Sequence, residues 1–325
     1  MRIGVQPVNS GPLATPEYIT ELAELADGLG FDSLQITDHL IMPVEYSSPY
    51  PYHPSGRMAA GPDDAYFEPL GLIAFLGGRT RRIRLGTSVL IAPYRHPVVT
   101  AKYLAGLDQL TGGRLVLGVG VGWMAEEFAA LGAPPFAERG AVTDEIIEVW
   151  RTLWRDQPAS FSGRFFQFAP LGLMPKPAQP GGIPIYIGGM SRPAIRRAAR
   201  LGDGWQPFKL TPQELEAGIA TLREQAAKIG RSLDGFTISL RLGLRLDAGP
   251  TERRAAEEPW KTLVGTPAEV IRDLETYERL GVTETVFDFR TCSADETRET
   301  LRLAAAALLP RFQSQGAAGA VRGST

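Results

Sequence analysis

Cysteine and histidine are scarce in this chain: the 325 residues include one cysteine, Cys292, and three histidines. A single cysteine excludes an internal disulfide and is typical of a reducing compartment, so we expect a cytoplasmic protein. The histidines are widely separated and show no His-Glu-x-x-His or other zinc-binding spacing, so we expect no metal. A Gly-x-Ser-x-Gly elbow is also missing, which argues against an acyl-enzyme hydrolase.

An excess of charge of one sign and long hydrophobic runs are missing as well. The chain has 34 basic and 36 acidic residues, and this balance gives no support to binding of nucleic acid or of a membrane surface. No apolar run approaches the length that crosses a bilayer, and the N-terminus shows no signal peptide. We therefore expect a small-molecule substrate, and neither nucleic acid nor membrane as a partner.

The chain shows instead a repeated order of short apolar strand, polar turn and amphipathic helix. We predict eight strands, around residues 2–6, 33–37, 82–91, 115–120, 183–187, 204–208, 236–240 and 285–289. Insertions follow the second and fourth strands: an aromatic- and proline-rich loop at 40–68 and a hairpin-like stretch at 160–182. Eight repeats indicate an α/β fold, a single (β/α)₈ TIM barrel over residues 1–312, and we expect a disordered tail at 313–325.

Glycine occupies every second position at the end of the fourth predicted strand: Gly118, Gly120 and Gly122, followed by Trp123. Because glycine weakens a strand, this pattern indicates a close approach to the backbone. A dinucleotide fingerprint needs a third glycine at position 123, and a P-loop needs a following Lys-Ser or Lys-Thr pair, so both are excluded. Two interpretations remain: a binding surface built from main chain, or glycines that only let a helix pack tightly on the strand.

The run Gly118-Val119-Gly120-Val121-Gly122-Trp123, followed by Glu127-Phe128, resembles the fourth-strand motif of the luciferase-like monooxygenase superfamily. Asp38-His39, Gly86-Thr87-Ser88-Val89 and Ile187-Gly188-Gly189 resemble further motifs of that superfamily, in the same order. More narrowly, the chain is similar to the branch that uses coenzyme F420, a deazaflavin, for hydride transfer. The resemblance implies an F420-dependent oxidoreductase that acts on a small organic substrate at the C-terminal face of the barrel.

Several alternatives remain open from the sequence. A relative with the same fold that uses reduced FMN and oxygen would be a monooxygenase. Another relative would bind flavin without catalysis, and an unrelated barrel would be a hydrolase or a lyase. Members of the superfamily are often dimers, so we also expect that the chain can form a homodimer.

Asp38 and His39 are the predicted catalytic residues. They form the only acid–imidazole pair at a predicted strand end, and histidine exchanges protons near neutral pH. The alternative is that His39 only anchors its loop by hydrogen bonding. By resemblance, the pair lies beside the edge of the deazaflavin where the hydride moves.

The predicted cofactor-binding residues come from three strand ends and the start of one helix. By resemblance, a cis peptide between Ser88 and Val89 forms a bulge behind the cofactor ring. A glycine turn then enters a basic helix, whose start can bind phosphate. The full predicted set is Ser88, Val89, Gly118, Gly120, Gly122, Trp123, Gly188, Gly189, Met190 and Arg192. Lys209 and Arg290 would contact an anionic substrate, face solvent or form ion pairs.

Overall fold

The computed structural model describes residues 1–246, 261–289 and 292–313. Its centre is a barrel of eight parallel strands, each paired with the next around the ring. In ring order the strands are β1 (Arg2–Gln6), β2 (Ser33–Ile36), β3 (Arg84–Ile91), β4 (Leu115–Gly120), β7 (Ile185–Gly188), β8 (Gly204–Gln206), β9 (Thr237–Leu246) and β11 (Glu284–Asp288). Pairing of β11 with β1 closes the ring, so the predicted (β/α)₈ barrel is confirmed.

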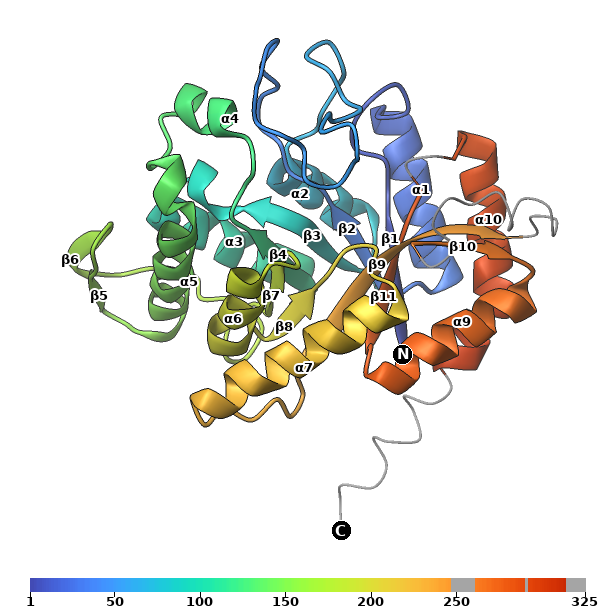
Figure 1. Cartoon of the computed structure of the whole chain (residues 1–325). Helices are drawn as coiled ribbons and strands as arrows, with labels where there is room; N and C mark the ends of the chain where they lie inside the picture. The colour runs from blue at the N-terminus through green and yellow to red at the C-terminus, as the bar shows by residue number, and fades with distance from the viewer. Residues whose placement is uncertain (247–260, 290–291, 314–325) are drawn as a thin grey trace.

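Helices cover the outside of the barrel, as Figure 1 shows. They are α1 (Pro16–Leu29), α2 (Pro69–Arg79), α3 (Pro97–Thr111), α5 (Arg139–Arg155), α6 (Arg192–Leu201), α7 (Pro212–Lys228), α9 (Pro267–Leu280) and α10 (Ala294–Ala307). The short helix α4 (Ala125–Ala130) lies instead above the strand ends, and the 3₁₀ turns are η1 (Ala92–Tyr94) and η2 (Phe136–Glu138). Capping boxes at Thr211, Thr266 and Ser293 begin α7, α9 and α10. These caps determine where each helix starts after the loop that precedes it.

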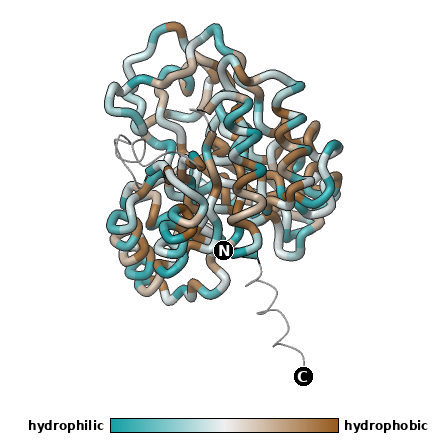
Figure 2. The backbone as a smooth tube through the Cα atoms, turned by 90° about the vertical axis from the view of Figure 1, so that its right-hand side faces the viewer, coloured by the Kyte–Doolittle hydropathy of each residue, from teal (hydrophilic) through white to brown (hydrophobic). Residues whose placement is uncertain are grey.

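The hydrophobic core lies between the strands and the helices that surround them, and many hydrophilic positions lie at the outside of the molecule (Figure 2). The interior of the barrel itself holds polar side chains. Arg84 pairs with buried Glu284 at 2.6 Å, and Gln206 Nε2 donates to Gln35 Oε1 at 2.6 Å. Hydrogen bonding offsets the cost of burying these groups, and Gln206 continues the polar interior up to the cavity described below.

Two insertions leave the barrel pattern. The hairpin-like stretch predicted at 160–182 is confirmed: β5 (Ala159–Ser162) and β6 (Gln167–Leu171) form an antiparallel hairpin. It projects away from the barrel in Figure 1. Residues 40–68, here called the lid loop, contain no named helix or strand and lie above the strand ends. The sheet also differs from the prediction at β9.

Strand β9 was predicted to end at residue 240, but it continues to Leu246 and pairs in parallel with an unpredicted strand, β10 (Thr262–Gly265). The arginines at 241 and 245 interrupt the apolar run, although Arg241 is buried inside the barrel. A polar residue that faces a polar barrel interior therefore conceals the continuation of a strand. Residues 314–325 of the predicted tail lie outside the described residues. None of the described helices is long and apolar enough to cross a membrane.

Candidate functional site

A cavity of about 910 Å³ lies at the carboxyl ends of the barrel strands, where TIM barrels place their active sites. Its walls come from the segments that follow β2, β4, β7 and β8, from residues of β3 and β9, and from α5 and α6. The predicted site residues that line it are Asp38, His39, Ser88, Val89, Gly120, Gly122, Trp123, Gly188, Gly189 and Met190. The sequence therefore located the cavity, although the surroundings of several residues differ from those expected.

Val89 lies between the ends of β4 and β7 and lines the cavity. The Ser88–Val89 peptide is cis, as predicted. A Cβ atom on Gly120 would lie 2.4 Å from Val89 Cγ2, and one on Gly188 would lie 2.5 Å from Val89 Cγ1. The close approach that these glycines permit is thus made by a valine of the same chain.

Gly118 and Arg192 do not line the cavity. A Cβ atom on Gly118 would lie 2.2 Å from the Thr87 carbonyl oxygen and 2.2 Å from Gln206 Oε1, so packing inside the barrel requires this glycine. Arg192 is exposed at the first turn of α6. If Arg192 contacts a cofactor, it must therefore contact a part of the cofactor that extends beyond the cavity.

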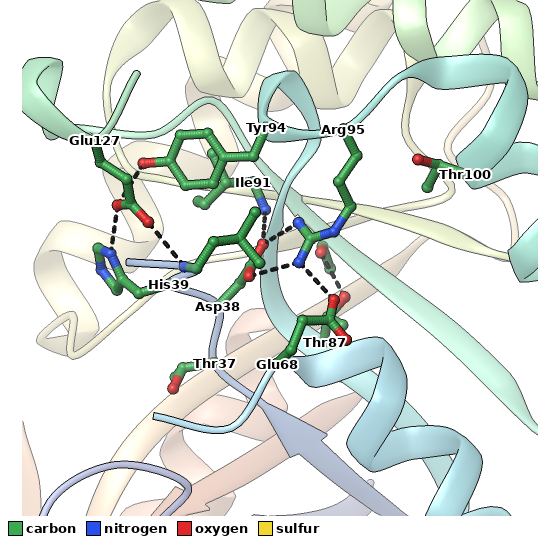
Figure 3. Close-up of polar contacts among 12 residues, drawn as sticks. Thr37, Asp38, His39, Glu68, Thr87, Ile91, Tyr94, Arg95, Thr100 and Glu127 are labelled. Atoms are coloured by element: carbon green, nitrogen blue, oxygen red, sulfur yellow. Dashed lines mark hydrogen bonds and ion pairs between the residues drawn. The ribbon is translucent and has the colours of Figure 1, made fainter. Parts of the chain in front are cut away.

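Asp38 does not pair with His39, which corrects the predicted acid–imidazole pair. The Asp38 carboxylate accepts two hydrogen bonds from Arg95, at 2.7 and 2.9 Å, and one from the Ile91 N–H at 2.8 Å (Figure 3). Burial raises the pKa of Asp38, and the Arg95 guanidinium opposes that shift. Arg95 also donates to Glu68 at 2.7 Å, so Asp38 ties the end of β2 to β3 and to the start of α2.

The partner of His39 is Glu127 on α4. His39 Nδ1 lies 2.7 Å from Glu127 Oε2, and the Glu127 side chain is fully buried (Figure 3). Oε2 also accepts the Tyr94 hydroxyl at 2.8 Å, and Oε1 accepts the backbone N–H of Leu40 at 2.8 Å and of Ile41 at 3.3 Å. One buried carboxylate therefore holds both the imidazole and the first residues of the lid loop.

Two pKa shifts follow from this arrangement. Burial alone would raise the pKa of Glu127, but the hydrogen bonds from His39, Leu40 and Tyr94 lower it below its ordinary value. Burial and the adjacent Glu127 charge raise the pKa of the Tyr94 hydroxyl. Glu127 is therefore ionised and Tyr94 is protonated across the physiological pH range.

A row of aromatic rings crosses the cavity from β2 to β8. The His39 and Trp123 ring centroids are 5.9 Å apart, and Trp123 packs edge-to-face on Tyr50 at 5.1 Å. Tyr50 contacts Tyr52 at 5.5 Å, and Tyr52 contacts Phe208 at 5.3 Å. Edge-to-face contacts of this kind stabilise the lid loop against the barrel and give the cavity an apolar wall.

Glu126, next to Glu127, fixes the middle of the lid loop. Its Oε1 accepts the Ser47 N–H at 2.7 Å, the Ser47 hydroxyl at 2.9 Å and the Ser48 N–H at 3.2 Å. These bonds, led by the one from the Ser47 backbone, hold the pKa of Glu126 down to about 2. Since this pKa is below the ordinary value of 4.5, the bonds are at full strength above pH 4.5 and are lost as the pH falls toward 2.

Glu126→Gln should free the lid loop without changing the rest of the site. Hydrogen bonds to a charged acceptor contribute about 1.5–3 kcal/mol, so amide hydrogen exchange at Ser47 and Ser48 should become at least about 10-fold faster. Mass-spectrometric hydrogen exchange measures this, with Glu45→Gln at an exposed position of the same loop as the control. Equal exchange rates in the two variants would show that Glu126 does not hold the loop.

One part of the cavity wall, here called the basic end, carries arginines. Arg139 and Arg197 line it together with the residues from Gly188 to the start of α6. Arg139 lies 4.0 Å above the Phe136 ring, and Arg197 pairs with Asp144 and donates to the Gly140 carbonyl at 2.9 Å. Two guanidinium groups beside a helix N-terminus can bind an anionic group such as a phosphate.

Lys209 does not line the cavity. Its backbone N–H donates to the Arg241 carbonyl at 2.8 Å, and its Nζ lies 5.3 Å from the centre of the Phe208 ring. Arg241, which the sequence analysis did not identify, lines the cavity and donates to the Ser88 carbonyl at 2.8 Å. Arg290 lies outside the described residues.

Comparison with known proteins agrees with this architecture. The sequence model of the luciferase-like monooxygenase family matches residues 1–261. An uncharacterised protein of Mycobacterium tuberculosis is 38% identical over 230 residues, which cover 68% of this chain and 78% of that protein. An F420-dependent glucose-6-phosphate dehydrogenase of Nocardia farcinica is 32% identical over 244 residues, which cover 72% of this chain and 66% of that protein.

The crystal structure of monooxygenase RslO1 from Streptomyces bottropensis shares the fold. It aligns with 96% of this chain and 100% of its own, with a TM-score of 0.77 and 24% identity. The chain belongs to the luciferase-like monooxygenase family. It is accordingly an oxidoreductase, as the resemblance implied.

Proposed function

We propose that the chain is an F420-dependent oxidoreductase that transfers a hydride between the deazaflavin and a small organic substrate. The observation that carries this proposal is a cavity that brings together a basic end at α5 and α6, the His39 imidazole and the aromatic rings of the lid loop. The F420-dependent relative at 32% identity supports the choice of cofactor. An FMN-dependent monooxygenase is the second candidate, because one terminal phosphate also suits the basic end.

The residues of the cavity fit a deazaflavin. Val89, held between Gly120 and Gly188, offers an apolar surface for a flat ring. Arg139 and Arg197 would hold the phosphodiester, and Arg192 on the exposed side of α6 would meet the acidic glutamyl tail. The bound cofactor would supply the hydride chemistry, while the protein orients it and excludes water.

The substrate would lie between the cofactor ring and the aromatic row. His39 is the histidine that lines the cavity, and it would exchange the proton that accompanies hydride transfer. Trp123 and Tyr50 would cover the substrate and keep the reacting atoms away from bulk water.

Titration of the apoprotein with both cofactors should show tighter binding of the deazaflavin than of FMN. Arg139→Ala should weaken both cofactors about 10-fold, because it removes a charge-assisted hydrogen bond to the phosphate that both contain. Arg192→Ala should weaken the deazaflavin alone and reduce its salt dependence, because only the longer acidic tail reaches this position. Arg200→Ala, on the same helix but outside the cavity, is the matched control.

Fluorescence or absorbance titration at several salt concentrations provides the measurement. Tighter binding of FMN would reject the hypothesis that F420 is the cofactor and would favour an FMN-dependent monooxygenase. Equal effects of Arg192→Ala on both cofactors would show that the helix does not follow the acidic tail.

A further inference from the structure

Glu127 is surrounded by hydrogen-bond donors. The Leu40 and Ile41 N–H groups and the Tyr94 hydroxyl occupy three of the acceptor positions of its carboxylate. His39 Nδ1 takes the fourth, at 2.7 Å from Oε2. A carboxylate that accepts from four partners has no proton of its own to give, so the proton in the His39–Glu127 hydrogen bond belongs to the imidazole.

This placement determines the form of the neutral imidazole. With the proton on Nδ1, Nε2 keeps a lone pair, because a neutral imidazole carries only one N–H. Nε2 has no hydrogen-bond partner among the residues that the structure describes, and His39 lines the cavity. The Tyr66 and Trp123 rings pack edge-to-face against the imidazole, at 5.4 and 5.9 Å, and restrict rotation of the ring.

We propose that Glu127 is a positioning residue that holds His39 in the Nδ1–H tautomer and thereby assigns proton exchange with the substrate to Nε2. Oxidation of a substrate removes one hydride and one proton. A bound deazaflavin would supply the hydride acceptor and Nε2 would take the proton, and reduction would run in reverse. When Nε2 takes up the proton, the buried Glu127 carboxylate stabilises the imidazolium that forms. The catalytic part rests on the function proposed above, whereas the tautomer does not.

Asp38 cannot perform this role, although it is adjacent to His39 in the sequence. Its two carboxylate oxygens are bonded to Arg95 and to the Ile91 N–H. Glu126 bonds through Oε1 to Ser47 and Ser48 in the lid loop, and the hydrogen bond of the His39 ring goes to Glu127 instead. Among the described residues, Glu127 is therefore the carboxylate that sets the tautomer of His39.

The tautomer can be observed directly by nitrogen NMR of protein labelled with ¹⁵N-histidine, without cofactor or substrate. In its neutral form, His39 should show a protonated Nδ1 and an unprotonated Nε2. His39→Gln identifies its signals among those of the three histidines. A wild-type spectrum with the proton on Nε2, or averaged between both nitrogens, would overturn the proposal.

Variants test whether Glu127 is the cause. Glu127→Gln can donate as well as accept, so it should give a mixture of both tautomers. Glu126→Gln makes the same chemical change one residue earlier and should leave the His39 signals as in wild type. Tyr94→Phe removes a different donor from Oε2 and should also keep the Nδ1–H tautomer. If Glu127→Gln folds and retains the wild-type tautomer, Glu127 is not the positioning residue.

Kinetics then tests the catalytic consequence. Glu127→Gln should lower kcat about 10-fold and leave KM and cofactor affinity near wild type, since it changes a residue that acts through His39. A changed tautomer with unchanged kcat would refute the link to catalysis. A wild-type protein that shows the expected tautomer but no F420-dependent activity would refute the proposed function and leave the role of Glu127 intact.

Discussion

Replacing His39 with alanine should lower turnover by about 10² to 10⁴, the usual contribution of general acid–base catalysis. Cofactor affinity should stay near wild type, because the basic end of the cavity is formed by α5 and α6 rather than by β2. The substitution removes the ring that contacts Tyr66 and Trp123, so some loss of stability is also expected. Turnover and binding must therefore be measured on folded protein.

Steady-state kinetics and cofactor titration separate these effects. His96→Ala is the matched control, because this exposed histidine lies outside the cavity and should retain wild-type turnover. His39→Gln keeps a polar side chain of similar size but cannot exchange protons, and it should be as slow as His39→Ala. Turnover close to wild type in both His39 variants would show that His39 only anchors its loop.

The barrel could be predicted because most of its elements are specified by local residues. Thr211, Thr266 and Ser293 define helix starts through bonds to residues three positions ahead. Apolar strands alternate with these helices, and eight repeats are enough to close a barrel. The continuation of β9 was missed because Arg241 faces a polar interior, which the strand pattern does not reveal.

Most residues of the candidate site were identified from the sequence as cavity-lining residues, but the hydrogen-bond partners among them were not. Glu127 lies 88 residues from His39 in the sequence. In the sequence, the adjacent pair Glu126 and Glu127 looks like two solvent-exposed acids on a short helix, although Glu127 is buried. Asp38 was assigned to His39 because the two are neighbours, although adjacent side chains at a strand end point in different directions. Only the packing of α4 against the β2 and β3 ends brings Glu127 and Tyr94 to the imidazole.

Packing also decides which side chains of the basic helix α6 face the cavity. Its arginines are close together in the sequence, and the helix period alone does not say which of them faces the cavity. Contacts with Asp144 and Gly140 on α5 turn Arg197 inward, whereas Arg192 stays exposed. Arg139 was missed because it comes from the start of α5, far from α6 in the sequence, and only the packing of α5 beside α6 brings it to the cavity. Interhelix packing thus decides which charges reach the site.

Gly188→Ala should destabilise the protein by about 1–3 kcal/mol, the usual cost of overpacking a well-filled site. The new Cβ atom would lie 2.5 Å from Val89 Cγ1, and relief requires Val89 to move. Because Val89 lines the cavity, this movement should also weaken cofactor binding. The substitution tests the steric contact alone, because Gly188 does not have a positive φ and an alanine there causes no backbone strain.

A double-mutant cycle with Val89→Ala isolates this contact. Once the Cγ1 methyl is absent, the nearest atoms to the Cβ of residue 188 are Val89 Cβ and the Val119 carbonyl oxygen, each at 3.5 Å, which is ordinary van der Waals contact. Gly188→Ala should therefore cost less than about 1 kcal/mol in the Val89→Ala background, which gives a clear coupling energy. Gly106→Ala on α3 is the control, because nothing lies within 4 Å of its new Cβ, and it should be stabilising by about 0.5–1 kcal/mol. Urea denaturation measures all four proteins of the cycle and the control. If Gly188→Ala lowers the free energy of unfolding equally with and without the Val89 methyl groups, then contact with Val89 is not the reason that position 188 requires glycine.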